Sequence, residues 1–321
     1  MTIPPRKSGR AMAIDICICT YRRPQLEQTL RSLATLRVPQ DAKLRVIVAD
    51  NDATPSARRL AYAIATALPF EIRYIHCPAS NISLARNACL EFSSADFLIF
   101  VDDDQEVASS DWLIELLSAA DRTGADVVLG PVLAVYGESA PGWMRAGDFH
   151  STFPVLVKGE IRTAYSANTL MRRASPAVAG RRFDLSLGRS GGEDTQFFAK
   201  VHQAGGRIAY APRAVAYEPV PASRASFAWL VKRRFRSGQT HGRLLGEDRS
   251  VAATAAEVLL AAAKAGYCFG AAAITAPWTQ RRNRYALRSV LHIGVAGGLL
   301  GVREIRQYGE SLPLARSGNA A

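Results

Sequence analysis

The sequence lacks the patterns that mark several common protein classes. Its 321 residues include five cysteines, an odd number without CxxC spacing, which indicates neither a zinc site nor a disulfide framework. The segment CTYRRP (19–24) contains no glycine, so the dinucleotide-binding GxGxxG fingerprint is absent there, and the P-loop pattern is also missing. No nucleic-acid-binding motif is present. These absences argue against a dinucleotide-binding dehydrogenase, a P-loop enzyme and a nucleic-acid-binding protein.

The N-terminal segment also lacks a targeting signal. Residues 1–19 include basic residues but no long apolar stretch followed by a cleavage site, so we expect no signal peptide and a disordered N-terminus over residues 1–12. Cys17 and Cys19 alternate along a strand pattern, and we expect both to be small core residues on one face of that strand. Free cysteines of this kind fit a reducing, cytoplasmic environment.

The composition is that of a folded protein with an excess of positive charge. Hydrophobic residues make up 48% of the chain and charged residues 21%, which excludes a disordered chain. The length suggests one large domain or one domain with an appendage. The formal net charge is +12, and such an excess indicates an anionic partner, such as a membrane surface or a phosphorylated substrate.

Strand and helix patterns alternate over the first two thirds of the chain. Strands are predicted at 14–20, 45–51, 71–76, 97–104 and 126–135, with helices at 25–36, 57–68 and from residue 83. This alternation predicts an α/β fold, with a mostly parallel, Rossmann-like sheet and helices on both faces. Such sheets bind ligands beyond the carboxyl ends of their strands, where this sequence carries Thr20, Tyr21, Asp50 and Asn51.

Three consecutive aspartates, Asp102, Asp103 and Asp104, follow the apolar run FLIFV. Adjacent carboxylates repel one another, and oxygen atoms are the ligands that Mg²⁺ and Mn²⁺ prefer. We therefore expect a divalent cation whose shell is completed by phosphate or water. Strand alternation directs Asp102 and Asp104 to one side and Asp103 to the other. The alternative is a solvated acidic turn; an EF-hand is excluded by the spacing.

Two further positions could meet a nucleotide at the same edge of the sheet. Asp50 ends the second strand, and Arg86 lies in the third helix, one element before the aspartates. A carboxylate can accept from a nucleobase or ribose, and a guanidinium can contact a base or a diphosphate. The alternatives are an Asx turn for Asp50 and an ordinary surface arginine for Arg86.

A second acidic pair, Glu193 and Asp194, follows Gly191 and Gly192 and precedes a predicted helix. A carboxylate presented by a glycine loop can act as a general base. The alternative is helix capping, with a favourable negative charge at the helix N-terminus.

These motifs occur in the order found in a known enzyme family. They are ICTYRRP, VADND, ARN at 85–87, FVDDD, the NTLMRR region and GGED. Over roughly residues 13–220 the sequence resembles family 2 glycosyltransferases with the GT-A nucleotide-diphospho-sugar transferase fold. CICTYRRP and FRSGQTHGR are similar to segments of bacterial exopolysaccharide glucosyltransferases of the succinoglycan type. The QxxRW motif of processive members is absent, so we do not expect processive polymerisation.

The resemblance implies an inverting, metal-dependent transfer of a sugar, glucose from a UDP-linked donor, to a hydroxyl of a lipid-linked oligosaccharide. It also implies Mn²⁺ or Mg²⁺ as cofactor. Asp194 would be the base, with Glu193 supporting the acceptor. The remaining implied contacts are Thr20, Tyr21, Asp50, Arg86 and Asp102 for the donor nucleotide, Asp104 and Asp102 for the metal, and Asn168 and Gly192 for the donor sugar or acceptor.

The composition changes after the predicted catalytic domain at 13–222. Residues 223–321 are basic and alanine-rich, and the apolar segment 251–277 carries only Glu257 and Lys264 as charges. Charges at the centre of a membrane span are costly and alanine contributes little to insertion. We expect helices that lie on an anionic membrane surface, at the cytoplasmic face of the bacterial inner membrane. The alternatives are an ordinary helical subdomain and a true membrane span.

Two other functions remain open from the sequence. A nucleotidyltransferase that makes nucleotide-sugars would need a glycine-rich phosphate loop after the first strand, and CTYRRP has no glycine. A non-catalytic glycan- or membrane-binding module would have no use for the acidic residues at the edge of the sheet.

Overall fold

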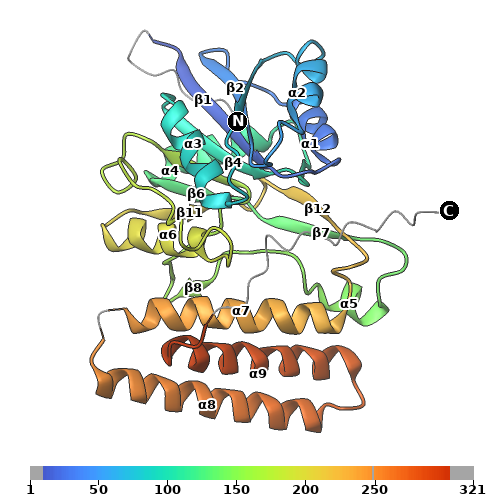
Figure 1. The fold of residues 1–321 in the computed structure, drawn as a ribbon, viewed down its shortest axis with the longest axis vertical. Coiled ribbons are helices and arrows are strands. Elements are labelled where there is room, and N and C mark those ends of the chain that lie inside the picture. Colours follow the sequence, from blue (N-terminus) through green and yellow to red (C-terminus); the bar gives the residue numbers. More distant parts are fainter. Residues whose placement is uncertain (1–9, 248, 304–321) are drawn as a thin grey trace, which may run out of the picture.

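The computed structural model describes residues 10–247 and 249–303, in which an α/β domain lies on a layer of three long helices (Figure 1). Most of the predicted disordered N-terminus and the segment 304–321 lie outside the described residues. Met12, however, is the first residue of strand β1 and is buried. The ordered domain therefore begins at least one residue before the predicted boundary at 13.

A seven-stranded sheet forms the centre of the α/β domain, in the order β11-β6-β10-β4-β1-β2-β3. β10 is antiparallel to both of its neighbours, and the other pairs are parallel. This arrangement confirms the predicted mostly parallel sheet. The strands are β1 (Met12–Thr20), β2 (Ala42–Asp50), β3 (Glu71–His76), β4 (Phe97–Asp102), β6 (Val127–Leu129), β10 (Thr169–Arg172) and β11 (Ile208–Tyr210).

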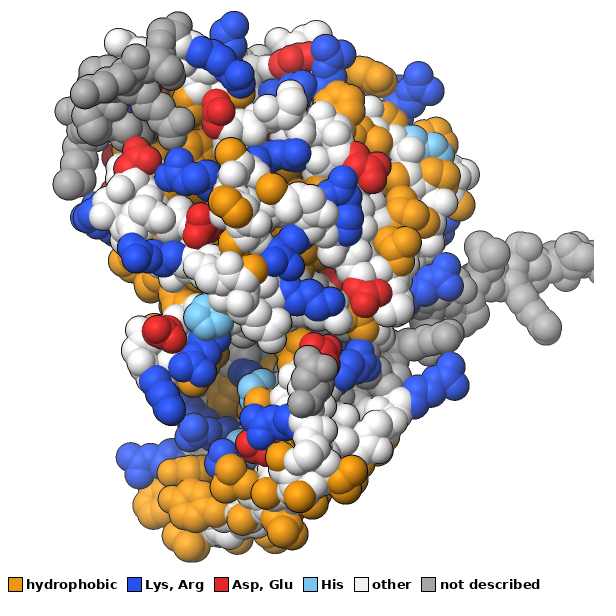
Figure 2. All heavy atoms as spheres, turned by 90° about the vertical axis from the view of Figure 1, so that its left-hand side faces the viewer, with side chains coloured by type: hydrophobic (Ala, Val, Ile, Leu, Met, Phe, Trp, Pro, Cys, Tyr) orange, Lys and Arg blue, Asp and Glu red, His pale blue; other side chains and the backbone are white. Residues whose placement is uncertain are grey.

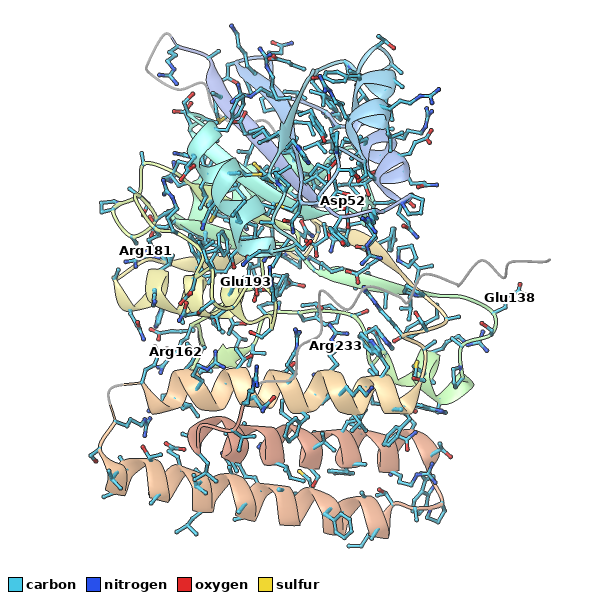
Figure 3. The ribbon with its side chains drawn as sticks, in the orientation of Figure 1. Asp52, Glu138, Arg162, Arg181, Glu193 and Arg233 are labelled. Carbon is cyan, nitrogen blue, oxygen red and sulfur yellow. The ribbon has the colours of Figure 1, made fainter. Side chains whose placement is uncertain are left out.

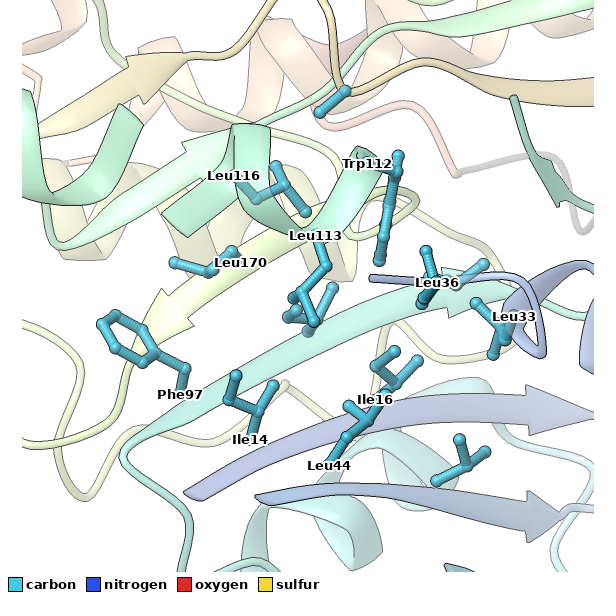
Figure 4. Packing of buried hydrophobic residues seen from close by; sticks show 14 of the residues in the cluster. Ile14, Ile16, Leu33, Leu36, Leu44, Phe97, Trp112, Leu113, Leu116 and Leu170 are labelled. Atoms are coloured by element: carbon cyan, nitrogen blue, oxygen red, sulfur yellow. The ribbon is translucent and has the colours of Figure 1, made fainter. Parts of the chain in front are cut away.

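Helices cover both faces of this sheet. One core cluster packs α1 (Leu26–Leu33), α2 (Arg58–Ala65) and α4 (Trp112–Thr123) on one face (Figure 4). The other cluster packs α3 (Ile82–Phe92) and α6 (Glu193–Gln203) on the opposite face. Ile14 and Ile16 of β1 belong to the first cluster and Cys17 to the second. The period-2 alternation of β1 thus supplies both cores, with about 1.5–3 kcal/mol for each large apolar side chain buried.

The predicted strand at 126–135 is in fact two strands. β6 joins the central sheet, and β7 (Val132–Tyr136) joins a smaller sheet with β5 (Glu106–Val107) and β12 (Ala216–Val220). Pro131 lies between them, and a proline cannot donate to a strand ladder. The chain therefore changes sheets at this residue. A short helix, α5 (Gly142–Gly147), and the hairpin β8 (Leu156–Val157) and β9 (Glu160–Ile161) complete the domain.

The helical layer consists of α7 (Phe227–Gly246), α8 (Val251–Ile274) and α9 (Thr279–Leu299). In Figure 1 α7 lies against the α/β domain, α8 is outermost, and α9 lies between them. α7 and α9 meet through glycines: a Cβ at Gly238 would lie 2.1 Å from the carbonyl oxygen of Leu291, and one at Gly294 would lie 2.1 Å from that of Phe235. The two backbones are in direct contact, as in small-xxx-small helix pairs, and we did not predict this from the sequence.

We expect Gly294→Ala to lower the free energy of unfolding by about 1–3 kcal/mol, because the new methyl group must push the backbones of α7 and α9 apart. The matched control is Gly266→Ala in α8, where a Cβ would meet no atom within 4 Å. That change should raise stability by up to about 1 kcal/mol, because alanine is the better helix former. Denaturant unfolding of both variants measures the difference. Equal effects would contradict backbone contact between the two helices.

Candidate active site

A cavity of about 380 Å³ opens where the carboxyl ends of β1, β2 and β4 meet the N-terminus of α6 and the upper face of α7. Its size falls within the range of about 300–1,000 Å³ that is typical of small-ligand sites. Thr20, Tyr21 and Asn51 line it from the strand ends. The position confirms the expectation that polar residues gather at this edge of the sheet.

All three aspartates at the end of β4, Asp102, Asp103 and Asp104, line the cavity. Asp103 accepts a hydrogen bond from the backbone N–H of Tyr21 at 3.4 Å, and the Arg23 guanidinium lies 3.7 Å from both Asp103 and Asp104. The prediction that Asp103 points away from its neighbours is therefore wrong. β4 ends at Asp102, so strand alternation no longer governs the side chains that follow it.

The aspartate turn holds more negative charge than its protein surroundings neutralise. Desolvation by the surrounding protein raises the pKa of Asp102 to about 8 although its side chain is 41% exposed, Arg86 opposes the shift, and Asp104 adds to it. Burial and Asp104 likewise raise the pKa of Asp103 to about 6. A deficit of positive charge beside carboxylate oxygens suits a hard divalent cation such as Mg²⁺ or Mn²⁺.

The protein offers only part of a coordination shell for such a cation. Over residues 10–247 and 249–303, no group of three or more His, Cys, Asp and Glu side chains is arranged to hold a metal ion. One or two carboxylates with phosphate oxygens and water is the arrangement that Mg²⁺ commonly adopts. Asp102 and Asp104 fit that arrangement when a ligand supplies the phosphate.

Glu218 of β12 is an additional carboxylate on the cavity wall that the sequence reasoning missed. Burial, followed by the charge of Asp104, raises its pKa. Its carboxylate accepts from Gln105 Nε2 at 3.2 Å and lies 3.7 Å from the Arg224 guanidinium. No sequence signal pointed to Glu218, because β12 reaches the site by pairing with β7 and β5, which are distant in the chain.

Arg86 connects the aspartates to the second acidic pair. Its side chain is 8% exposed, its guanidinium donates to Glu193 Oε1, and it lies 3.9 Å from Asp102 Oδ1. Burial alone would lower the pKa of Arg86, but Glu193 and Asp102 raise it, so the side chain stays charged. Glu193 Oε2 is buried without a hydrogen-bond partner, and Glu193 lines the cavity. The site thus contains an acceptor atom with no protein donor.

Asp194 lies in the first turn of α6, directly after Gly191, Gly192 and Glu193. Both glycines have positive φ, +86° and +91°, which other residues adopt only at a cost. Asp194 is partly exposed and lines the cavity, and its Oδ1 accepts from the Thr195 backbone N–H at 2.6 Å. The helix N-terminus favours these negative charges, so helix stabilisation and a presented carboxylate coexist here.

Asp50 was predicted to contact the donor nucleotide, but it does not lie on the cavity wall. It is fully buried, and its carboxylate accepts from the Ala57 N–H at 2.8 Å, the Asp52 N–H at 3.1 Å and the Tyr74 hydroxyl at 2.8 Å. Its neighbour Asn51 lines the cavity instead. Asp50 therefore organises the loop behind the wall, because its oxygens are already occupied by protein donors.

Asn168 also needs a correction. It is fully buried with φ of +56°. Its side-chain oxygen accepts a hydrogen bond from Trp112 Nε1 at 2.9 Å, and its side-chain nitrogen donates to the carbonyl oxygens of Pro131 and Ala214 at 2.9 and 2.7 Å. The predicted contact with sugar is wrong in this structure, because all of these polar atoms bond the protein interior. The residues just before it, 166 and 167, line the cavity.

A basic and aromatic wall closes the cavity on the side of the helical layer. His150 stacks on Trp229 with ring centroids 5.2 Å apart, and the guanidinium of Arg233 lies 5.4 Å from the Trp229 ring. Arg224 and Arg236 line the same wall. Figure 3 shows Glu193 and Arg233 between the sheet and α7, and Figure 2 shows Lys and Arg side chains around the hollow above the helical layer. The basic run was evident in the sequence; its orientation toward the cavity was not.

Comparisons with known proteins identify the family. The family described as Glycosyl transferase family 2 matches residues 15–176. The chain is 61% identical over 301 residues to the succinoglycan biosynthesis protein ExoM of Rhizobium meliloti (strain 1021), which covers 94% of this chain and 97% of that protein.

Solved structures share the fold at low sequence identity. The mannosyltransferase PcManGT from Pyrobaculum calidifontis, in complex with GDP-Man and Mn²⁺, has a TM-score of 0.61 and 18% identity, over 94% of this chain and 90% of that one. S. aureus TarS 1–349 in complex with UDP has a TM-score of 0.52 and 18% identity, over 94% and 98%. The chain spans 54% of a longer TarS structure.

The family match covers half of the chain, and the likeness to ExoM covers nearly all of it. The nucleotidyltransferase and the non-catalytic binding module are therefore excluded. The sheet order, the position of the cavity and these comparisons lead to one conclusion: the chain has the GT-A fold and is an enzyme of glycosyltransferase family 2.

Proposed function

We propose that this enzyme transfers glucose from UDP-glucose to a hydroxyl of a lipid-linked oligosaccharide during exopolysaccharide synthesis, with inversion at the anomeric carbon. The observation that supports the proposal is that two separate sets of acidic side chains line the same cavity. Asp102 and Asp104 lie on one part of its wall and Glu193 and Asp194 on another, and buried Arg86 contacts Asp102 on one side and Glu193 on the other. A leaving diphosphate and an attacking hydroxyl need separate groups of this kind.

The donor nucleotide would lie against the strand ends. Thr20, Tyr21 and Asn51 line that part of the cavity, and the TarS complex with UDP supports a uridine nucleotide. The resemblance to exopolysaccharide glucosyltransferases supports glucose, and the likeness to the succinoglycan biosynthesis protein ExoM supports an exopolysaccharide product. Arg23, which follows β1, and the arginines of the basic wall would offset the phosphate charge.

Asp102 and Asp104 would hold Mn²⁺ or Mg²⁺ together with the diphosphate, as the PcManGT complex with Mn²⁺ supports. The bound cation would offset the negative charge that develops on the leaving group. Asp194 would accept the proton of the attacking hydroxyl, and Glu193, which also lines the cavity, would support the acceptor. A single displacement by that hydroxyl inverts the anomeric centre.

A lipid-linked acceptor would place the reaction at a membrane, and α8 would supply a suitable surface. It is the one helix among the described residues that is long and apolar enough to cross a membrane. A single stripe of α8 that includes Ala261, Ala265 and Cys268 is buried, while Leu259 and Tyr267 are 71% and 72% exposed. Figure 2 shows hydrophobic side chains gathered along the edge of the helical layer, with Lys and Arg beside them.

Because α8 packs on α9 along that stripe, we propose that it lies on the membrane and does not cross it. Its outer face would enter the headgroup region of an anionic bilayer, at the cytoplasmic side of the inner membrane, with the neighbouring cations meeting lipid phosphates. This attachment also accounts for part of the net charge of +12.

The cation site is tested by thermal unfolding with UDP, GDP, ADP and CDP, each with and without Mn²⁺. We expect stabilisation by UDP only when Mn²⁺ is present, reaching about 2.7 kcal/mol at a hundredfold excess over Kd. Asp104→Asn should abolish this shift, because it removes a charged oxygen ligand. Asp121→Asn in α4, which lies outside the cavity lining, is the control. The absence of any metal-dependent shift in the wild type would refute the proposed donor site.

The proposed base is tested by turnover of Asp194→Asn. This variant should keep the Mn²⁺-dependent stabilisation by UDP but lose transfer by a factor of about 10²–10⁴, because the amide cannot accept the proton. Transfer is measured as UDP released from UDP-glucose with lipid-linked glycans extracted from bacterial membranes. Turnover at the wild-type rate would show that another group is the base.

Membrane attachment is tested by co-sedimentation with vesicles that contain phosphatidylglycerol. We expect the double variant Leu259→Glu, Tyr267→Glu to bind at least tenfold more weakly, because both side chains belong to the exposed apolar face of α8. The control is Tyr62→Glu in α2, a residue that is 55% exposed and belongs to the α/β domain. If both proteins bind as the wild type does, α8 is not the docking surface.

A further inference from the structure

α7 is held by close contacts on two opposite faces. Gly238 and Gly242 meet the backbone of α9, where a Cβ at Gly242 would lie 2.2 Å from the carbonyl oxygen of Val295. Arg236 and Thr240 alternate with these glycines along the chain. Residues two positions apart in a helix lie roughly opposite one another, so Arg236 and Thr240 face the α/β domain. α7 therefore cannot move closer to α9.

The domain-facing side of α7 contacts the glycine turn before α6. Arg236 Nη1 donates to the carbonyl oxygen of Ser190 at 2.8 Å, and a Cβ at Gly191 would lie 2.1 Å from the same nitrogen. A Cβ at Gly192 would lie 2.6 Å from Cγ2 of Thr240. Each glycine of the turn thus lies against one side chain of α7. A Cβ at Gly192 would overlap the short Thr240 side chain, and one at Gly191 would displace the end of Arg236 from its hydrogen bond.

The same loop is fixed from its other side by the N-terminal end of α3. Ser83 Oγ donates to the carbonyl oxygen of Asp184 at 2.7 Å, and the Ile82 N–H donates to that of Gly188 at 3.1 Å. The loop from 184 to 192 is thus enclosed between α3 and α7. Its last residue, Gly192, leads directly into Glu193 and Asp194, so a displacement of the turn displaces these two carboxylates.

We propose that Arg236 and Thr240 are positioning residues, which place the Asp194 carboxylate at its working distance from the attacking hydroxyl by supporting the Gly191–Gly192 turn. This inference rests on the proposed role of Asp194 as the base. A misplacement of about 1 Å can cost a factor of 10² in rate. The helical layer is then part of the catalytic apparatus as well as the attachment to the membrane, because α9 fixes the α7 helix that carries both residues.

Arg236 has a second conceivable role, since it also lines the cavity and could contact the donor diphosphate. Thr240 separates the two roles. It is outside the cavity lining and 9% exposed, so it affects the reaction only through the turn. Thr240→Leu enlarges the side chain against Gly192, whereas Thr240→Val keeps its shape. Lys232→Gln, on an exposed position of the same helix, controls for loss of a positive charge.

The position of the turn is measured by amide hydrogen exchange, which requires no substrate. Thr240→Leu and Arg236→Gln should raise exchange at least tenfold in peptides that cover residues 186–196, because local opening becomes easier. Thr240→Val and Lys232→Gln should leave those peptides unchanged. Unchanged exchange in both Thr240→Leu and Arg236→Gln would overturn the proposal. General acceleration across the α/β domain would overturn it too, because the effect would then be unfolding.

Kinetics then separate positioning from donor binding. For Thr240→Leu we expect kcat for UDP release from UDP-glucose, with extracted lipid-linked glycans, to fall about 10²-fold while KM for UDP-glucose and the UDP-induced thermal shift stay within twofold. A raised KM with unchanged kcat would overturn the proposal and place Thr240 in donor binding. Wild-type activity that survives Asp194→Asn would refute the base assignment instead, and the exchange experiment would still report on the turn.

Discussion

The buried guanidinium of Arg86 is the interaction on which the arrangement of the site depends. It joins Asp102 at the end of β4, in the central sheet, to Glu193 at the start of α6, a helix that comes much later in the chain. Burial raises the pKa of both carboxyl groups, and the charge of Arg86 opposes that rise. Leaving Glu193 buried without its partner would cost about 3–5 kcal/mol. The Arg86 guanidinium thus fixes the separation between the proposed metal-binding aspartates and the acidic pair that contains the proposed base.

Steric contacts at glycine extend this order from the site to the outer surface. The turn at Gly191 and Gly192 rests on α7, and α7 rests on α9 through Gly238 and Gly294. Each contact brings a backbone against a side chain or another backbone, and packed interiors of this density transmit displacement because they contain little free volume. The apolar face of α8 lies at the far end of this series (Figure 1). The membrane-facing helix α8 and the proposed catalytic carboxylate would therefore be connected by one continuous series of packing contacts.

Acidic and basic side chains both line the cavity, and they come from different elements. The carboxylates of the cavity lie at the strand ends, on β12 and at the start of α6. Arg23 and Arg86 lie beside the aspartates, and further arginines come from α7 and from the segment that leads into it. An anionic diphosphate bound with a divalent cation would meet complementary charge on both sides, and electrostatic steering of this kind also raises the rate of ligand capture.

What the sequence determined by itself rests on signals between near neighbours. The apolar strands, the aspartate turn after FLIFV and the glycine pair before Glu193 and Asp194 were all predictable, because strand period, charge repulsion and glycine conformation act over a few residues. Asp50 and Asn168 show where prediction from local sequence patterns fails. Each lies at the predicted edge of the sheet, but hydrogen bonds to residues distant in the chain direct its side chain into the protein interior. Glu218 entered the site only through strand pairing. The tertiary structure alone decided which polar side chains face the cavity, because that choice depends on partners that no local pattern contains.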